Sequence, residues 1–165
     1  EIDLAIVGGK IPNELAKNLI IENFVEDEFS LIIPKSHPFA IKNMITKEDL
    51  YNLNFITLNS NSTIRKFIDT ILIQNRIETK QLKIILQLNS IEGIKTAVSL
   101  GLGAAFMSSA AIEKEIELKT IKILKIDNIK ITRTLSIISN PDSYKSKAFE
   151  FLYSELYYLK SNLDN

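Results

Sequence analysis

Gly101 and Gly103 are spaced as in the glycine-rich loops that cradle phosphates, which makes them the first candidates for chemistry in this sequence. Such a loop needs a strand before the glycines and a helix after them, so that the helix N–H groups face the phosphate. Here "IEGIKTAVSL" before them has helical spacing, and "GAAFMS" after them is typical of a buried strand. Phe106 also occupies the place of the third glycine. We therefore expect Gly101 to end a helix and Gly103 to allow a tight turn, with no nucleotide bound there.

Small polar residues follow three of the predicted strands, "DLAIV", "NFITL" and "KIILQL". In that order they are Gly8 and Gly9, then Asn61, Ser62 and Thr63, and then Asn89 and Ser90. Ligands of open α/β sheets bind outside the carboxyl ends of strands, and helix N-termini favour carboxylates and phosphates. The pattern is consistent with a cleft for a small anion. The alternative that these residues only cap helices stays open, because such residue types cap helices widely.

Two further side chains could bind or titrate. Arg65 lies in the first turn of the predicted helix after "NFITL", where it could pair with an anionic ligand or, as we expect, point to solvent. His37 lies between two prolines with no Cys or second His beside it, so we expect a surface turn residue. No triad or metal-ligand spacing appears, and the sequence predicts neither an enzyme nor a bound cofactor or metal.

The composition excludes several classes of protein. The 165 residues carry zero formal net charge, no cysteine and one histidine, which excludes disulfides and thiolate catalysis and leaves little for a metal site. The sequence has no long basic run, so it does not predict that this stretch binds nucleic acid by itself. It also has no apolar run long enough to span a membrane. A bias towards Ile, Lys and Asn indicates an AT-rich genome, such as that of a plastid or a low-GC bacterium.

Predicted strands and helices alternate along the chain, which favours an α/β fold with a parallel or mixed sheet. The strand-like runs 18–25 and 29–39 are separated by an expected acidic turn from Glu26 to Glu28. Thr46 and Asp49 have capping-box spacing at the start of a short predicted helix. Asn89 is the expected N-cap of the helix that ends at Gly101. Further helices are expected over 110–118 and from 141 or 142 to about 159.

Four segments, in this order and at suitable spacing, resemble the effector-binding domain of the LysR-type transcriptional regulators. They are "EIDLAIVGG", "FSLIIPKSHPFA", "EDLYNLNFITLNSNSTIRKFID" and "NSIEGIKTAVSLGLGAAFMS". The resemblance implies a type 2 periplasmic-binding-protein-like fold, with two α/β lobes, two crossovers and a small effector bound between the lobes. By similarity, lobe I would comprise 1–34 and 108–165, and lobe II would comprise 35–107.

The resemblance also assigns effector contacts. The matching positions are Gly8 and Gly9 after the lobe I strand, Ser62 and Thr63 at one helix start of lobe II, Asn89 and Ser90 at the other, and Met107 and Ser108 at the second crossover. Members of the family carry an N-terminal winged helix-turn-helix that binds DNA, and they form homo-oligomers, dimers or tetramers, through side-by-side effector domains. No membrane partner is implied.

This sequence departs from the family pattern at its start. The helix-turn-helix, the linker helix and the first β-α-β of lobe I have no counterpart here, and Glu1 to Val7 already has the pattern of a strand. We therefore expect an upstream part to be missing and the 165 residues alone to be unstable, because an absent interior strand exposes sheet edges and apolar surface.

Within the family, "LAIVGG", "PNEL", "NSTIRK" and "RTLSII" resemble the branch that regulates RuBisCO operons in algal plastids and cyanobacteria. This implies control of carbon-fixation genes in the chloroplast stroma or, alternatively, in a bacterial cytoplasm. A solute-binding protein of the transport type, built from the same lobes, is the second hypothesis. An enzyme on this fold related to porphobilinogen deaminase would need a cysteine to carry its cofactor, and the sequence has none.

Overall fold

A computed structural model describes residues 3–142 and 144–163 and divides the chain into two compact units. Unit 1 takes in the chain up to Asp27 and again from Thr132 onwards, and unit 2 is the continuous segment Glu28–Ile131. The borders expected from the resemblance, at 34 and 108, differ from these. The reason is that Leu31–Pro34 pair with Ile121–Leu124, and apolar residues of both segments lie in the core of unit 2.

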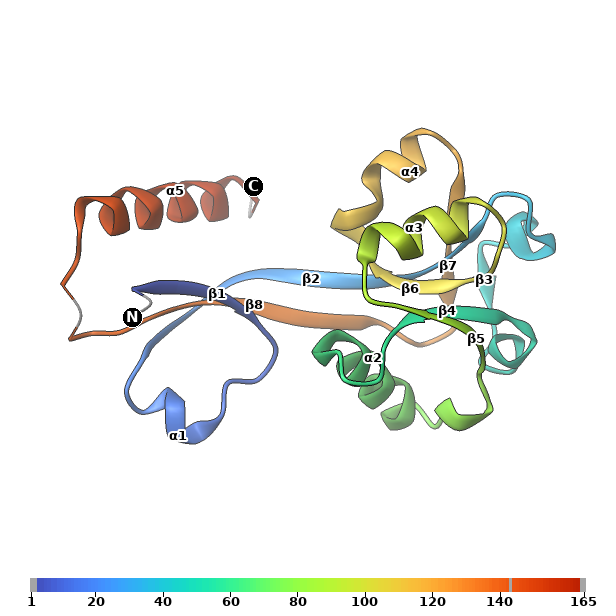
Figure 1. Cartoon of the computed structure of the whole chain (residues 1–165), viewed down its shortest axis with the longest axis horizontal. Coiled ribbons are helices and arrows are strands. Elements are labelled where there is room, and N and C mark those ends of the chain that lie inside the picture. Colours follow the sequence, from blue (N-terminus) through green and yellow to red (C-terminus); the bar gives the residue numbers. More distant parts are fainter. Residues whose placement is uncertain (1–2, 143, 164–165) are drawn as a thin grey trace. The chain divides into compact units, whose positions relative to one another are not determined.

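Strands and helices alternate as expected (Figure 1). The strands are β1 Leu4–Gly8, β2 Ile20–Pro34, β3 Met44–Ile45, β4 Asn54–Leu58, β5 Lys83–Leu88, β6 Ala105–Ser108, β7 Ile121–Ile126 and β8 Ile131–Ser139. The α-helices are α1 Asn13–Ala16, α2 Thr63–Gln74, α3 Ile91–Ser99, α4 Glu113–Glu117 and α5 Lys147–Leu163. Short 3-10 helices span Pro38–Ile41, Glu48–Asn52, Thr79–Gln81 and Ser109–Ile112. No helix in the described ranges is long and apolar enough to cross a membrane.

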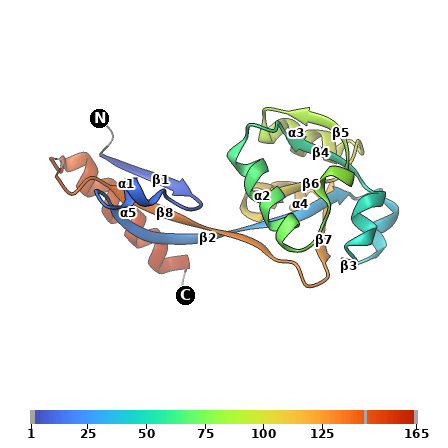
Figure 2. The same ribbon diagram turned by 90° about the horizontal axis from the view of Figure 1, so that it is seen from below.

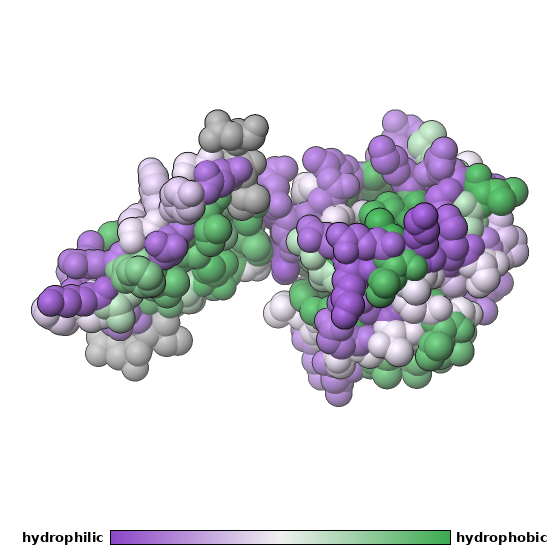
Figure 3. Space-filling view, turned by 90° about the horizontal axis from the view of Figure 1, so that it is seen from above, coloured by the Kyte–Doolittle hydropathy of each residue, from purple (hydrophilic) through white to green (hydrophobic). Residues whose placement is uncertain are grey.

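Unit 1 is a small antiparallel sheet with one long helix. β1 pairs with β8, and β8 lies beside the first half of β2. Helix α5 buries Phe149 and Leu156, and the Tyr153 hydroxyl donates to Glu22 of β2. Hydrophobic side chains also lie on the surface of this unit (Figure 3), among them Phe151 and Tyr158, which are more than 60% exposed.

The acidic segment within β2 is not a turn, so that prediction is wrong. Glu26, Asp27 and Glu28 lie inside one continuous strand of 15 residues. Alternation along the strand turns Asp27 towards Arg133 of β8, whereas Glu28 pairs with Lys130. The cationic partners, which are far away in the sequence, allow a run of carboxylates that would favour a turn in isolation to remain extended.

Unit 2 contains a mixed sheet, as the alternation predicts. The second half of β2 runs antiparallel to both β6 and β7, and β3 runs parallel to β7. β4 and β5 form a parallel pair, and a bridge between Phe55 and Ala104 joins this pair to the chain just before β6. The carboxyl ends of β4 and β5 therefore meet at one edge.

Helices cover both faces of this sheet. On one face Ile68 and Leu72 of α2 pack in a core with Phe29, Leu31 and Phe55. On the other face α3 packs in a second core, whose buried members are Ile32, Ile56, Ile94, Ala97, Val98, Ala105, Met107, Ile112 and Ile121. Figures 1 and 2 show α2 and α3 leading away from the neighbouring strands β4 and β5.

The two glycines of the opening motif have separate roles. Gly101 has φ +88°, its N–H bonds to the Val98 carbonyl, and the Leu102 N–H bonds to the Ala97 carbonyl. This is a Schellman helix end, as predicted. Gly103 does not serve a turn. A Cβ there would lie 2.6 Å from the Asn54 carbonyl oxygen, so the glycine allows the chain to approach β4 closely.

The predicted helix starts have caps of the expected type, but several of the helices begin at other residues than predicted. The N-cap of α3 is Ser90 and not Asn89, because the Ser90 hydroxyl accepts from the Gly93 N–H. Thr46 and Asp49 form the expected reciprocal capping box, but the turn that follows is a 3-10 helix. α4 is only Glu113–Glu117, and α5 begins at Lys147 rather than at 141 or 142.

Candidate functional site

Asn59 and Asn89 join the two strand ends at the edge of unit 2. Each asparagine is the first residue after its strand, β4 or β5. The Asn59 side-chain amide donates to the Asn89 side-chain oxygen over 2.5 Å. The structure thus brings together two of the predicted strand exits. Asn59 was missed in the sequence; its position directly after "NFITL" was the available signal.

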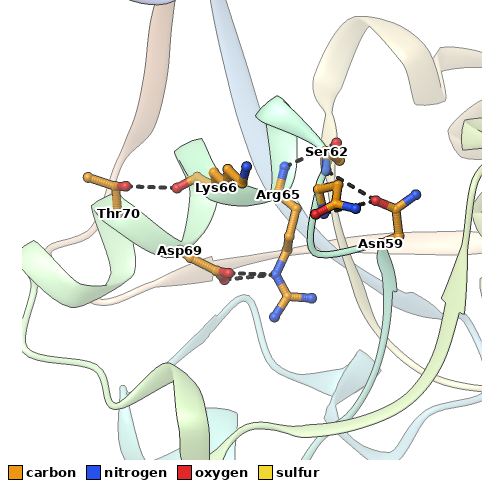
Figure 4. Close-up of polar contacts among 7 residues, drawn as sticks. Asn59, Ser62, Arg65, Lys66, Asp69 and Thr70 are labelled. Carbon is orange, nitrogen blue, oxygen red and sulfur yellow. Dashed lines mark hydrogen bonds and ion pairs between the residues drawn. The ribbon is translucent and has the colours of Figure 1, made fainter.

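Asn59 also shapes the start of α2 (Figure 4). Its side-chain oxygen accepts the N–H groups of Asn61 and Ser62 at 3.0 and 3.1 Å, which forms an Asx turn. The Ser62 hydroxyl accepts from the Arg65 N–H at 3.4 Å as the N-cap. Thr63 is the first helical residue. These local bonds explain why "LNSNST" turns directly from strand to helix.

Helix α3 begins at the neighbouring strand end in the same way. The Ser90 hydroxyl accepts from the Gly93 N–H at 3.2 Å. Glu92 in the first turn is 78% exposed and is paired with Lys95 at 2.9 Å. The α2 and α3 N-termini therefore both follow the joined strand ends. The first N–H groups of a helix lack partners within it, and the helix dipole favours negative charge there.

Thr57 is an unusual polar residue on β4. Its hydroxyl is buried and makes no hydrogen bond within the described ranges. Thr57 lies near the carboxyl end of β4, two residues before Asn59. A buried hydroxyl without a partner costs free energy, and it can be satisfied by a bound ligand or a water molecule.

Arg65 does not point to solvent, so that expectation is wrong. Its side chain is 12% exposed, and its Nε donates to both carboxylate oxygens of Asp69 at 2.9 and 2.8 Å (Figure 4). These bonds use the inner nitrogen of the guanidinium and leave its two terminal nitrogens outside the pair. The pair is held by its spacing of four residues on α2.

Other predicted residues lie elsewhere. Met107 is 4% exposed in the core of unit 2, where a side chain mainly contributes packing, and Ser108 ends β6 opposite Phe29. Gly8 and Gly9 belong to unit 1, where Gly8 ends β1 and Gly9 has φ +96°.

His37 is the N-cap of a 3-10 helix, consistent with a turn residue. Its Nδ1 accepts from the Phe39 N–H at 3.0 Å, and partial burial lowers the pKa of its imidazole. The acceptor role requires the neutral ring, so the geometry and the lowered pKa agree. The bond is local, between residues two positions apart.

A hollow of about 620 Å³ lies elsewhere on unit 2, between β2, β7 and the turn that follows β7. Its lining includes Phe29, Phe106 and Ile129, with Lys125 and Asp127 also on its wall. None of the eight residues predicted to contact an effector lines it. Opposite charges and a core-like floor give this hollow no clear ligand chemistry. The described ranges also hold no group of three or more His, Cys, Asp or Glu side chains suited to a metal.

The strand edge with Asn59, Asn89, Ser62 and Ser90 is therefore the best candidate site in unit 2. It offers amide and hydroxyl groups and two helix N-termini, which suit a carboxylate or phosphate.

Residues 1–156 match the sequence family described as LysR substrate binding domain. The chain belongs to this family. The predicted family resemblance is confirmed, and so is the fold class, a two-unit α/β arrangement of the type 2 periplasmic-binding-protein kind.

Curated relatives of this LysR-family chain come from algae and from Synechocystis. A probable RuBisCO transcriptional regulator of Phaeodactylum tricornutum is 78% identical over 165 residues, which are 100% of this chain and 54% of the relative. One from Thalassiosira pseudonana is 70% identical over 162 residues, covering 97% and 53%. The chain spans about half the length of the curated relatives that it matches.

The regulatory domain of CcmR from Synechocystis PCC6803, solved in complex with 2-PG, has a similar structure. The TM-score is 0.83 at 25% identity, and the match covers 98% of this chain and 75% of that domain.

Proposed function

We propose that this LysR-family chain is the effector-sensing part of a DNA-binding transcription regulator of RuBisCO or carbon-fixation genes, acting in the plastid stroma. The high identity to probable RuBisCO transcriptional regulators of algae supports the target genes and the compartment. DNA binding is assigned to sequence outside this stretch, in a homo-oligomer, because the chain spans about half of those relatives. No catalytic role is proposed.

The observation that carries the effector proposal is the hydrogen bond between Asn59 and Asn89. It joins the carboxyl ends of two parallel strands, each followed by a capped helix. The effector is a small anion whose carboxylate or phosphate accepts from the helix N-termini and from the Ser62 and Ser90 hydroxyls. The buried Thr57 hydroxyl offers one further group on the same strand. The 2-PG complex of CcmR makes 2-PG the first compound to test.

The test uses the full-length gene product, with 2-PG binding measured by calorimetry. Ser62→Ala and Ser90→Ala each remove a hydroxyl from the site, and we expect the dissociation constant to rise about tenfold, the effect of one hydrogen bond to a charged group. Thr46→Ala is the matched control, because it removes a cap from the 3-10 helix Glu48–Asn52 and leaves α2 and α3 intact. Its binding should equal that of the unchanged protein.

Two results would contradict the proposal. If Ser62→Ala, Ser90→Ala and Thr46→Ala all bound 2-PG as tightly as the unchanged protein, the strand edge would not be part of the effector site. Binding of 2-PG with no affinity for DNA upstream of RuBisCO genes, measured by fluorescence anisotropy with and without 2-PG, would favour a solute-binding protein instead.

A further inference from the structure

β2 and β8 are the two strands by which the chain passes between its units. β2 leaves unit 1 after Asp27, and β8 enters unit 1 at Thr132. The strands are hydrogen-bonded neighbours (Figure 2). Any change in the twist or separation of these strands therefore acts on both connections of unit 2.

An ion pair ties the strands together beside this border. Arg133 of β8 donates from Nε to Asp27 Oδ2 at 2.9 Å, and its Nη2 lies 2.8 Å from the same oxygen. The side chains are 17% and 9% exposed, so water screens this pair weakly. Lys130 and Glu28 form the next pair along, but at 3.8 Å and with more than half of each side chain exposed. An exposed pair of this kind contributes little.

Gly8 makes room for the arginine. A Cβ on Gly8 would lie 2.9 Å from both Cζ and Nη1 of Arg133 and 3.0 Å from a methyl group of Leu135. The φ angle of Gly8 is outside the left-handed region, so the backbone itself would accept a side chain. A side chain at this position would have to displace the guanidinium or the Leu135 methyl group. This accounts for Gly8 without any contact to an effector.

We propose that Arg133 is a positioning residue for the two connecting strands. Its guanidinium packs against Gly8 and binds Asp27. This contact couples β2 to β8 at the border between units 1 and 2, so that the two strands separate and twist together. The role follows from the contacts within unit 1 and does not depend on which effector binds, or on whether one binds at all.

Hydrogen exchange of the full-length gene product tests the proposal. Arg133→Gln removes the ion pair, and Gly8→Ala displaces the guanidinium without altering either partner. Each should speed exchange of the amides in 24–27 and 133–135 by about ten- to a hundredfold, because a buried charged hydrogen bond is lost. The double variant should exchange no faster than either single variant. Lys130→Gln is the matched control, because it removes the neighbouring exposed pair, and it should leave these rates unchanged.

Additive effects in the double variant would overturn the proposal, since they would mean that Gly8→Ala acts through Leu135 and not through Arg133. Unchanged exchange in Gly8→Ala would overturn it as well. Exchange that rises equally in the buried turn of α3 would show a general loss of stability and no positioning role. If Arg133→Gln fails to fold, Gly8→Ala decides alone, because it keeps both charges.

Discussion

Lys95 is a buried cation whose removal has a predictable cost. Its ammonium group lies 2.9 Å from Glu92, 3.2 Å from Glu115 and 3.0 Å from the Ala111 carbonyl oxygen. The Lys95 side chain is 10% exposed and the Glu115 side chain is 15% exposed, so both are largely buried. The other oxygen of Glu115 is buried without a hydrogen bond in the described ranges. Lys95 therefore neutralises the carboxylate that joins α3 to α4.

We expect Lys95→Met to destabilise unit 2 by about 2–3 kcal/mol. Removing one partner of a fully buried pair costs about 3–5 kcal/mol, and the exposed Glu92 end of this cluster lowers that figure. The methionine keeps most of the packing of the lysine stem, so the loss reflects the charge. The assay is amide exchange at Ile94 and Val98 of α3, from which the free energy of opening is obtained.

Glu115→Gln provides the decisive comparison. Added to Lys95→Met, it removes the uncompensated charge and should recover more than half of the lost free energy. The hydrogen bond that Lys95 donates to Glu92 is the largest cause that raises its pKa above the ordinary value; burial acts against it, and Glu115 adds to the rise. The stability that Lys95 contributes is thus complete below the unfolded pKa near 10.5 and fades as the pH rises through the raised value. A Lys95→Met variant within 0.5 kcal/mol of the unchanged protein at pH 7 would refute this reasoning.

Two other predictions follow from single contacts. The hydrogen bond to Glu22, together with burial, raises the pKa of Tyr153 to about 12, so one tyrosine should ionise near that pH in ultraviolet titration, and Glu22→Gln should return it towards 10. Stability from this contact is present below pH 10 and is lost between pH 10 and 12; a tyrosine titration without a late step would contradict it. Gly101→Ala should cost about 1–2 kcal/mol for the left-handed φ, and Gly103→Ala about 1–3 kcal/mol for separating β4 from the chain before β6, both measured by thermal unfolding. If both variants melted at the same temperature as the unchanged protein, the roles given to the two glycines would be contradicted.

The sequence predicted well the features that depend on local bonds. The Schellman end at Gly101, the Thr46–Asp49 capping box and the Ser62 cap each involve residues within five positions of one another. Hydrophobic spacing was also sufficient for α2, because Ile68 and Leu72 face one core. The α/β alternation and the family resemblance followed from such patterns.

The failures share a different cause, which is a partner distant in the sequence. Glu26 to Glu28 stay extended because Asp27 meets Arg133, 106 positions away. Arg65 is an exception, because its partner Asp69 lies only four residues further along α2, although the place of Arg65 in the first turn suited solvent equally well. Gly103 is needed because of Asn54 on another strand. Asn59 became visible as a site residue only when the parallel pairing of β4 and β5 brought it to Asn89.

The continuous unit 2 has a consequence for the order of folding. Unit 1 is built from two stretches separated by the whole of Glu28–Ile131, so pairing β2 with β8 closes a loop of about a hundred residues, which costs about 4 kcal/mol in chain entropy. Folding of unit 2 brings Glu28 to within 3.8 Å of Lys130 and so closes that loop beforehand. During synthesis unit 2 is complete before most of β8 is made. We therefore expect unit 2 to fold first and unit 1 to assemble on it, so that mutations that slow the folding of unit 2 delay both units.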